Sequence, residues 1–448
     1  MKNKDISNKF LNDISKDYSK NMKSKIISNA VIKNGINNIA INRDSVIKMQ
    51  HTFSEEIKTG VITNQKKSGR CWMFAGLNKI RYAMAQKLNL NIDEKEGFEL
   101  SQAYLMFWDK LEKANYFLES IIETRREKIN SRLLMWILNN AMIDGGQWDM
   151  FVNLVEKYGI IPKFVMPESY HSSDSALMNK ILNLKLREFA KVLREDLKEQ
   201  EEGDLRDRKK EMIKEFYALL CHFFGETPKV FDFEYRDKEN DFYHDRNLTP
   251  LEFYKRYSPI KVSDYISIIN SPTSDKPFGK TYTVKYLGNV KEGREVLYLN
   301  LKIDELKKLT ISQLKDGETV WFGCDVGQML DRKSGILDSD LYHYEEILDT
   351  SFQLSKADRL NYGDSCLTHA MVFTGVNILE NGPNRWKVEN SWGKENGKDG
   401  FFVMSDKWFD QFMYQVVVNK KHLSEGYLAA LEKPPIKLEP WDPMGSLA

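Results

Sequence analysis

The stretch QKKSGRCW, residues 65–72, carries the sharpest chemical signal in this sequence. Cys71 stands at the start of an apolar helical pattern that runs to Leu88, so we expect it to open a helix. Unpaired backbone N–H groups and the positive end of the dipole stabilise a thiolate there. Gly69 allows a tight turn before the helix, and Gln65 carries an amide donor on the same loop. The pattern predicts a nucleophilic cysteine whose oxyanion is held by the Gln65 side chain and the Cys71 N–H.

A nucleophilic cysteine needs a base and a group that orients the base, and two C-terminal segments offer them. These are LTHA at 367–370 and VENSWG at 388–393, each at one end of a β-type run. We expect His369 to take the thiol proton and the Asn390 amide oxygen to accept from the other ring nitrogen. Trp392 would cover that hydrogen bond and exclude water from it.

Each of these residues also has a purely structural interpretation. A free cysteine is usually a buried small side chain, so Cys71 alone fits a core position as well as a catalytic one. His369 alone would more often be a structural histidine, and Asn390 alone a turn or cap residue. The spacing from Gln65 to Cys71, together with the two matched C-terminal segments, favours catalysis.

The whole set resembles the papain-like cysteine peptidases, and within them the bleomycin hydrolase/aminopeptidase C branch. Further segments that resemble this branch are NQKKSGRCW at 64–72, FWDKLEKAN at 107–115, WFGCDV at 321–326 and PWDPMG at 440–445. The resemblance extends nearly from end to end. It implies an α+β fold, with a papain-like two-lobed core, a large helical insertion and a hook-like projecting module. It also implies a cysteine-type aminopeptidase, a peptide hydrolase with bleomycin hydrolase-type amide hydrolysis as a further activity.

Two departures from ordinary papain are informative. Ser68 stands where the usual signature has a second cysteine, which removes a structural disulfide and suits a reducing cytosol. His369 lies 298 residues after Cys71, whereas roughly 130–150 is typical of papain and the cathepsins. The extra length is enough for an inserted domain, and residues 168–278 account for most of it.

The chain divides into five expected parts. They are an N-terminal extension packing on the core (1–60), a helical lobe with the nucleophile (61–167), a helical insertion and hook module (168–278), a β lobe with His369 and Asn390 (279–430), and a C-terminal arm (431–448). Apolar spacing predicts helices over 1–30, 71–88, 100–118, 125–142, 151–158 and 175–224. Period-two patterning predicts an exposed strand around Phe233. Aromatic and charged residues with scattered prolines suggest an irregular projecting module over 236–275. Strands are expected from Tyr282 onward, with a helix over 303–314 between two of them.

Composition excludes several classes of protein. Lys plus Arg is 66 and Asp plus Glu is 65 in 448 residues, so a net charge of +1 gives no broad attraction to nucleic acid or an anionic membrane. Hydrophobic residues make up 42%, which excludes wholesale disorder, and no apolar run is long enough to span a bilayer. Four cysteines are too few for a disulfide framework, so we expect free thiols. With no secretory leader pattern at the N-terminus, we expect a cytoplasmic protein.

The C-terminal tail holds four of the chain's twelve prolines in its last fifteen residues, at Pro434, Pro435, Pro440 and Pro443. Such a segment cannot form a helix or an inner strand and should run extended. In the resembled family the arm lies in the cleft, its last carboxylate meets the substrate's free α-amine, and subunits assemble as a hexamer. The resemblance therefore implies Ala448 and Trp392 as substrate-binding residues, peptides with a free N-terminus as substrates, and a homohexamer.

Alternative functions stay open at this point. An endopeptidase or a dipeptidyl-peptidase would use the same residues, and N-blocked and free-amine substrates would separate them. A nucleic-acid-binding hexamer with secondary peptidase activity is a further alternative that the net charge does not support. The other histidines are isolated and no HExxH or CxxC motif occurs, so we expect no metal and no cofactor.

Overall fold

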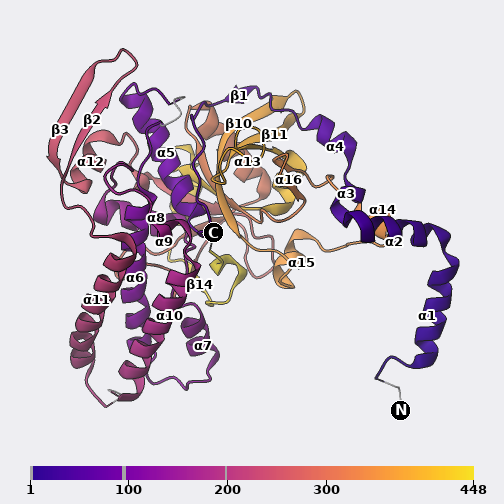
Figure 1. Ribbon diagram of the computed structural model, residues 1–448, viewed down its shortest axis with the longest axis horizontal. Helices are drawn as coiled ribbons and strands as arrows, with labels where there is room; N and C mark the ends of the chain where they lie inside the picture. Colours follow the sequence, from indigo (N-terminus) through magenta and orange to yellow (C-terminus); the bar gives the residue numbers. More distant parts are fainter. Residues whose placement is uncertain (1–3, 93–96, 197–198, 448) are drawn as a thin grey trace.

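The computed structural model describes residues 4–92, 97–196 and 199–447. Helix α5 (Cys71–Lys87) lies between a group of helices and a large sheet (Figure 1). Most of its side chains pack in the core of the helical side, whereas Tyr82 packs in the core of the sheet side. The arrangement confirms the α+β class and the two-lobed core.

The helical side is built around α6, which packs against α10 and α11 (Figure 1). Its helices are α6 (Gln102–Glu123), α7 (Arg132–Asn139), α8 (Trp148–Tyr158), α9 (Tyr170–Ser173), α10 (Ala176–Lys191), α11 (Glu202–Phe224) and α12 (Pro250–Tyr257). A π-helical turn, Val192–Asp196, follows α10. The buried positions Met178, Leu182 and Leu186 of α10 have the three-four spacing that predicted a helix there.

Two helices of this side differ in length from the sequence prediction. The helix expected over 100–118 continues to Glu123, and the one expected over 125–142 is shortened to α7. Ser131 explains the second difference, because its side chain accepts from the Leu134 N–H and starts a new helix. A serine cap satisfies a backbone donor that a continuous helix would otherwise use, so it favours a fresh start over continuation.

The sheet contains twelve strands within the described residues. Its order is β14 (Ile436–Leu438), β5 (Lys280–Val284), β6 (Tyr298–Asn300), β4 (Tyr265–Ile269), β13 (Met413–Asn419), β7 (Val320–Cys324), β10 (His369–Leu379), β11 (Gly382–Glu389), β12 (Phe401–Ser405), β9 (Ile336–Leu337) and β8 (Leu330–Asp331), with β1 (Glu55–Glu56) pairing with β10. The β7, β10 and β11 strands are antiparallel, and His369 lies opposite Cys324. His369 is the first residue of β10, and β11 ends just before Asn390.

Short helices flank the sheet. They are α13 (Ile303–Lys315), α14 (Tyr344–Leu348), α15 (Lys356–Asn361), α16 (Asp406–Phe412) and α17 (Glu425–Leu431), with 3-10 turns at Val262–Asp264, Lys420–His422 and Pro443–Gly445. Helix α13 packs against β10 and β13, and α16 against β11. The prediction of a helix over 303–314 is confirmed.

The region expected to be irregular, 236–275, is regular instead. It holds β3 (Phe242–Leu248), which pairs with β2 (Phe231–Arg236), then α12, and then β4 inside the large sheet. The strand expected to be exposed is also buried on one face, because Phe231 and Phe233 pack on Phe253 of α12 with ring centroids 5.4 and 4.9 Å apart. Phe231, Phe233 and Phe253 form the core of this hairpin module, whereas Phe242 and Tyr243 are exposed.

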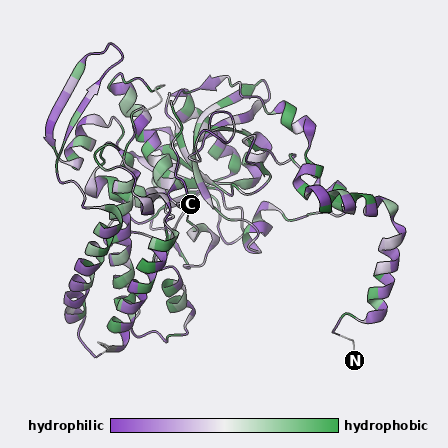
Figure 2. Ribbon diagram, viewed as in Figure 1, coloured by the Kyte–Doolittle hydropathy of each residue, from purple (hydrophilic) through white to green (hydrophobic). Residues whose placement is uncertain are grey.

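The N-terminal segment comprises α1 (Asn8–Lys20), α2 (Met22–Asn34), α3 (Ile36–Ala40) and α4 (Arg43–Lys48). The sequence predicts one helix over 1–30, but Asn21 divides it, since its side chain accepts from the Ser24 N–H and caps α2. Helix α1 projects away from the molecule and buries none of its residues (Figures 1 and 2). Phe10 and Leu11 are among its exposed apolar residues.

The tail runs extended, as its prolines predict. Strand β14 pairs with β5 in parallel and occupies the edge of the sheet. The 3-10 turn Pro443–Gly445 interrupts this extended course near the end. Among the described helices, none combines the length and the apolar character that crossing a bilayer requires.

Candidate active site

Cys71 is the first residue of α5, as its position in the sequence predicts. No side chain caps this helix start. The thiol is 2% exposed, and burial raises the pKa of Cys71 to about 11, while backbone N–H groups of Ala370, Trp72 and Cys71 itself act to lower it. The helix start therefore does not yield the lowered pKa that its dipole suggests, because burial outweighs the N–H groups.

His369 and Asn390 come together at adjacent strand ends. The His369 Nε2 lies 2.9 Å from the Asn390 Oδ1, and the Ser391 N–H also donates to that oxygen at 2.7 Å. The Trp392 ring lies 4.7 Å from the imidazole, with an angle of 31° between the planes, and shields one side of this contact. The backbone N–H of Ala370, the residue after His369, interacts with the Cys71 thiol, so the start of β10 lies beside the start of α5.

The electrostatics of the imidazole follow from burial. Burial lowers the pKa of His369 to about 4, the Asn390 contact acts in the opposite direction, and the Arg332 charge lowers it further. A lone imidazolium and a lone thiolate are thus both disfavoured in this site. A proton transfer from Cys71 to His369 would form both charges together, and each would then stabilise the other.

Gln65 is fixed by two segments that lie far apart in the sequence. Its backbone N–H donates to the Ser391 carbonyl at 2.8 Å, and its Oε1 accepts from the Ser391 hydroxyl at 2.6 Å. Its Nε2 donates to the Ser68 carbonyl at 2.7 Å. An amide nitrogen carries two hydrogens, so one N–H remains for an oxyanion. The bonds to Ser391 also join this loop to the segment that carries Asn390.

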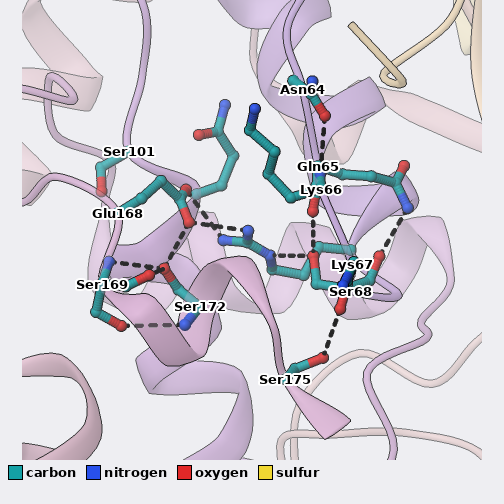
Figure 3. A network of polar contacts seen from close by, with 12 residues as sticks. Asn64, Gln65, Lys66, Lys67, Ser68, Ser101, Glu168, Ser169, Ser172 and Ser175 are labelled. Carbon is teal, nitrogen blue, oxygen red and sulfur yellow. Dashed lines mark hydrogen bonds and ion pairs between the residues drawn. The ribbon is translucent and has the colours of Figure 1, made fainter.

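Ser68, at the position of the absent cysteine, belongs to a polar network (Figure 3). Its hydroxyl donates to the Gln65 carbonyl at 2.7 Å and accepts from the Arg70 Nε at 2.8 Å. Arg70 in turn binds Glu168 with two N–H groups, at 3.1 and 2.9 Å, and Glu168 accepts from Ser172. Bidentate guanidinium–carboxylate pairing is geometrically strict, so it holds the loop where a disulfide would otherwise act.

Asp144 is a site residue that sequence reasoning missed. Its carboxylate accepts from the Gly69 N–H at 3.1 Å and from the Lys110 Nζ at 2.6 Å, and its carbonyl accepts from the Trp72 Nε1 at 2.8 Å. Burial opposes the charge, but the Lys110 ammonium and the hydrogen bonds hold the pKa of Asp144 well below its usual range. A signal was present in the sequence, since Lys110 and Lys113 interrupt an otherwise apolar face of the predicted helix.

The end of the C-terminal arm approaches this region. The Gln147 Nε2 donates to the Ser446 carbonyl at 2.7 Å, and a cavity of about 460 Å³ lies between the arm and helices α6 and α7. Ala448, expected to bind substrate, lies outside the described residues. All four cysteines are free. No three His, Cys, Asp or Glu side chains gather as metal ligands in the part of the chain that the structure describes.

Fold and site together define a papain-like cysteine peptidase. The chain belongs to the Peptidase C1-like family, whose pattern it matches over residues 5–445. It is 52% identical over 438 residues to aminopeptidase C of Listeria innocua, covering 98% of each chain, and 45% identical to that of Streptococcus thermophilus, covering 99% of each. Human bleomycin hydrolase is 43% identical over 421 residues, 92% of this chain and 91% of the other.

A solved structure extends the likeness to three dimensions. The crystal structure of PepW from Lactobacillus rhamnosis HN001 superposes with a TM-score of 0.96 at 48% identity, covering 99% of this chain and 100% of that one. These relatives confirm the resemblance to the bleomycin hydrolase/aminopeptidase C branch and its two-lobed fold.

Proposed function

We propose that this chain is a cysteine aminopeptidase that releases N-terminal residues from peptides, with Cys71, His369, Asn390 and Gln65 as its catalytic residues. The observation that carries the proposal is the 2.9 Å contact between His369 and Asn390, with His369 on β10, which packs against the helix that Cys71 opens. The names of the relatives, aminopeptidase C and bleomycin hydrolase, support the same activity and the same class of substrate.

The proposed reaction is acyl transfer. His369 accepts the Cys71 proton while the sulfur attacks the peptide carbonyl, and the Gln65 N–H and Cys71 N–H hold the oxyanion. His369 then protonates the leaving amine, and water activated by the same imidazole hydrolyses the thioester. Asn390 keeps the ring oriented throughout, because its oxygen is itself fixed by the Ser391 N–H.

Active-site labelling tests the nucleophile. A thiol-specific epoxide should label Cys71 stoichiometrically, as mapped by peptide mass spectrometry, and Cys71→Ala should abolish both labelling and turnover. Cys221→Ser is the matched control, since that thiol is the more accessible one in the helical part and should not matter. Labelling at Cys221, or turnover in Cys71→Ala, would reject the assignment.

The C-terminal arm is proposed to limit cleavage to the free amino end, with Ala448 facing the substrate amine and Trp392 lining the cleft. The arm reaches the Gln147 side chain, which donates to the Ser446 carbonyl. Gln147 lies close in sequence to Asp144, which contacts Gly69 and Trp72 on either side of Cys71. These contacts support the proposed role of the arm. Deleting residues 444–448 should give hydrolysis of N-blocked peptides that the full chain does not cleave. Retention of strict aminopeptidase selectivity would count against this role.

Assembly and location complete the proposal. The uncovered apolar residues of the projecting α1 suit a contact with a neighbouring subunit, and we propose a homohexamer. Sedimentation velocity should give a six-subunit mass that falls when residues 1–20 are removed. Free thiols suit the cytoplasm, and fractionation of the cell would test that location.

A further inference from the structure

The C-terminal arm is held by contacts from three separate parts of the chain. Strand β14 pairs with β5, Arg132 of α7 stacks on the Trp441 ring at 3.8 Å, and Gln147 binds the Ser446 carbonyl. Between these points the cavity of about 460 Å³ separates the arm from α6 and α7. Met444 is buried in the main core and holds the arm by apolar packing, and polar contacts hold the arm beside the cavity.

Lys276 adds a further buried polar contact to the arm. Its side chain is 4% exposed, and its Nζ lies 2.8 Å from the Asp442 Oδ2 and 2.7 Å from the Asp275 Oδ2. Burial opposes the charge, yet the bonds to Asp275 and Asp442 raise the pKa of Lys276 above its usual value. The ammonium is therefore kept charged and engaged with the arm.

Asp442 transmits this contact to the last turn of the arm. While Oδ2 binds Lys276, Oδ1 accepts from the Met444 N–H at 2.9 Å, and the Asp442 carbonyl accepts from the Gly445 N–H at 2.8 Å. One carboxylate thus anchors the arm and shapes the 3-10 turn that leads to Ser446. Its side chain is 12% exposed, so water cannot easily replace Lys276.

A second ion pair on the same arm offers a natural comparison. Lys285 and Glu439 lie 2.6 Å apart, but their side chains are 43% and 51% exposed. Exposed pairs contribute little, because water and salt screen them and two mobile side chains must be ordered. Two pairs of similar geometry on one segment therefore differ mainly in burial.

We propose that Lys276 and Asp442 form a latch that positions the end of the arm, and so set the preference of the enzyme for a free amino terminus. This inference rests on the proposed function of the arm. Without the latch, the turn at 443–445 loses the ion pair between Asp442 and Lys276, and the residues after the turn can leave the cleft. The catalytic residues stay in place, because within the described residues none of them forms a hydrogen bond or ion pair with Lys276 or Asp442.

The test compares leucyl-aminomethylcoumarin with its benzyloxycarbonyl-blocked form, using the full chain and sites counted by epoxide titration. Lys276→Met and Asp442→Asn should each raise the blocked-to-free ratio of kcat/KM at least tenfold. Asp442→Asn retains the acceptor for the Met444 N–H, so it removes the ion pair with little change of shape. Lys285→Gln is the control and should leave the ratio within twofold of wild type. A merely structural role would lower both activities together and leave the ratio unchanged.

Deletion of residues 444–448 distinguishes a failure of the proposed role of the arm from a failure of the latch. If the deletion leaves blocked peptides uncleaved, the proposed role of the arm fails. If the deletion opens the site but Lys276→Met and Asp442→Asn retain the wild-type ratio, the arm limits cleavage without this latch and the present inference is overturned. If both variants approach the ratio of the deletion while Lys285→Gln does not, the latch is supported.

Discussion

Replacing Asp144 by alanine should destabilise the helical lobe and disturb the nucleophile loop. The carboxylate accepts four bonds, from the Gly69 N–H at 3.1 Å, the Lys110 Nζ at 2.6 Å, the Ser175 hydroxyl at 2.5 Å and the Asn179 amide at 2.8 Å. The Lys110 side chain is 0% exposed. Its remaining hydrogen bond is to the Ile143 carbonyl at 3.1 Å, so Asp144→Ala leaves a buried cation without a bonded carboxylate.

The expected magnitude follows from this burial. Removing one member of a buried ion pair costs about 3–5 kcal/mol, whereas replacing both members with apolar groups is often close to neutral. Asp144→Ala should therefore lower the free energy of unfolding by about 4 kcal/mol, and Asp144→Ala/Lys110→Met should recover more than half of that loss. With Lys110→Met alone as the fourth member, the double-mutant cycle isolates the pair from the other three bonds to Asp144.

Urea unfolding at pH 7, followed by tryptophan fluorescence, measures these changes, and epoxide labelling reports the reactivity of Cys71. Because the folded pKa of Asp144 is lowered, its stabilisation is present above the unfolded value of about 3.9 and is lost as pH falls below it. The wild-type protein should lose this increment in acid, and Asp144→Ala should not. A single variant within about 1 kcal/mol of wild type, or no recovery in the double variant, would refute the reasoning.

Three other predictions follow from the site. Asn390→Ala should lower kcat severalfold yet leave residual turnover, since the His369 ring loses its orienting oxygen; unchanged steady-state kinetics would remove Asn390 from catalysis. Gly146→Ala should lower the melting temperature and epoxide reactivity, because the new Cβ would stand 2.5 Å from the Trp72 ring, and a wild-type melt would contradict this. Burial holds His369 neutral down to about pH 4, so stability should rise with pH between about 4 and 6.5, and His369→Gln should flatten that slope in urea titrations.

Local sequence determined the parts of this protein that depend on near neighbours along the chain. The apolar spacing after Gly69 places Cys71 at a helix start, and three-four spacing identifies α10, because each signal repeats over a few residues. The prolines of the tail exclude a helix and leave an edge strand, as β14 shows. The segments around His369 and Asn390 were placed at strand ends for the same local reason.

Predictions failed where a distant partner changes the meaning of a local pattern. The pattern around Phe231 and Phe233 suggested an exposed strand, yet both rings pack on Phe253 of α12. Likewise, the helix start at Cys71 suggests a lowered pKa, but the sheet packed over it buries the thiol and raises the pKa instead. Neither effect has a signature within one segment.

Tertiary structure alone decided which charged residues act together. Lys110 and Asp144 are 34 residues apart, and Lys276 and Asp442 are far more distant, yet each pair is buried at under 3 Å. In the sequence each of these residues looks like part of a solvated surface, because a charge is normally exposed. Burial turns the same charges into fixed contacts, since an unpaired ion cannot remain in an apolar interior. The sequence specifies the reactive groups, and the folded chain specifies what holds them in position.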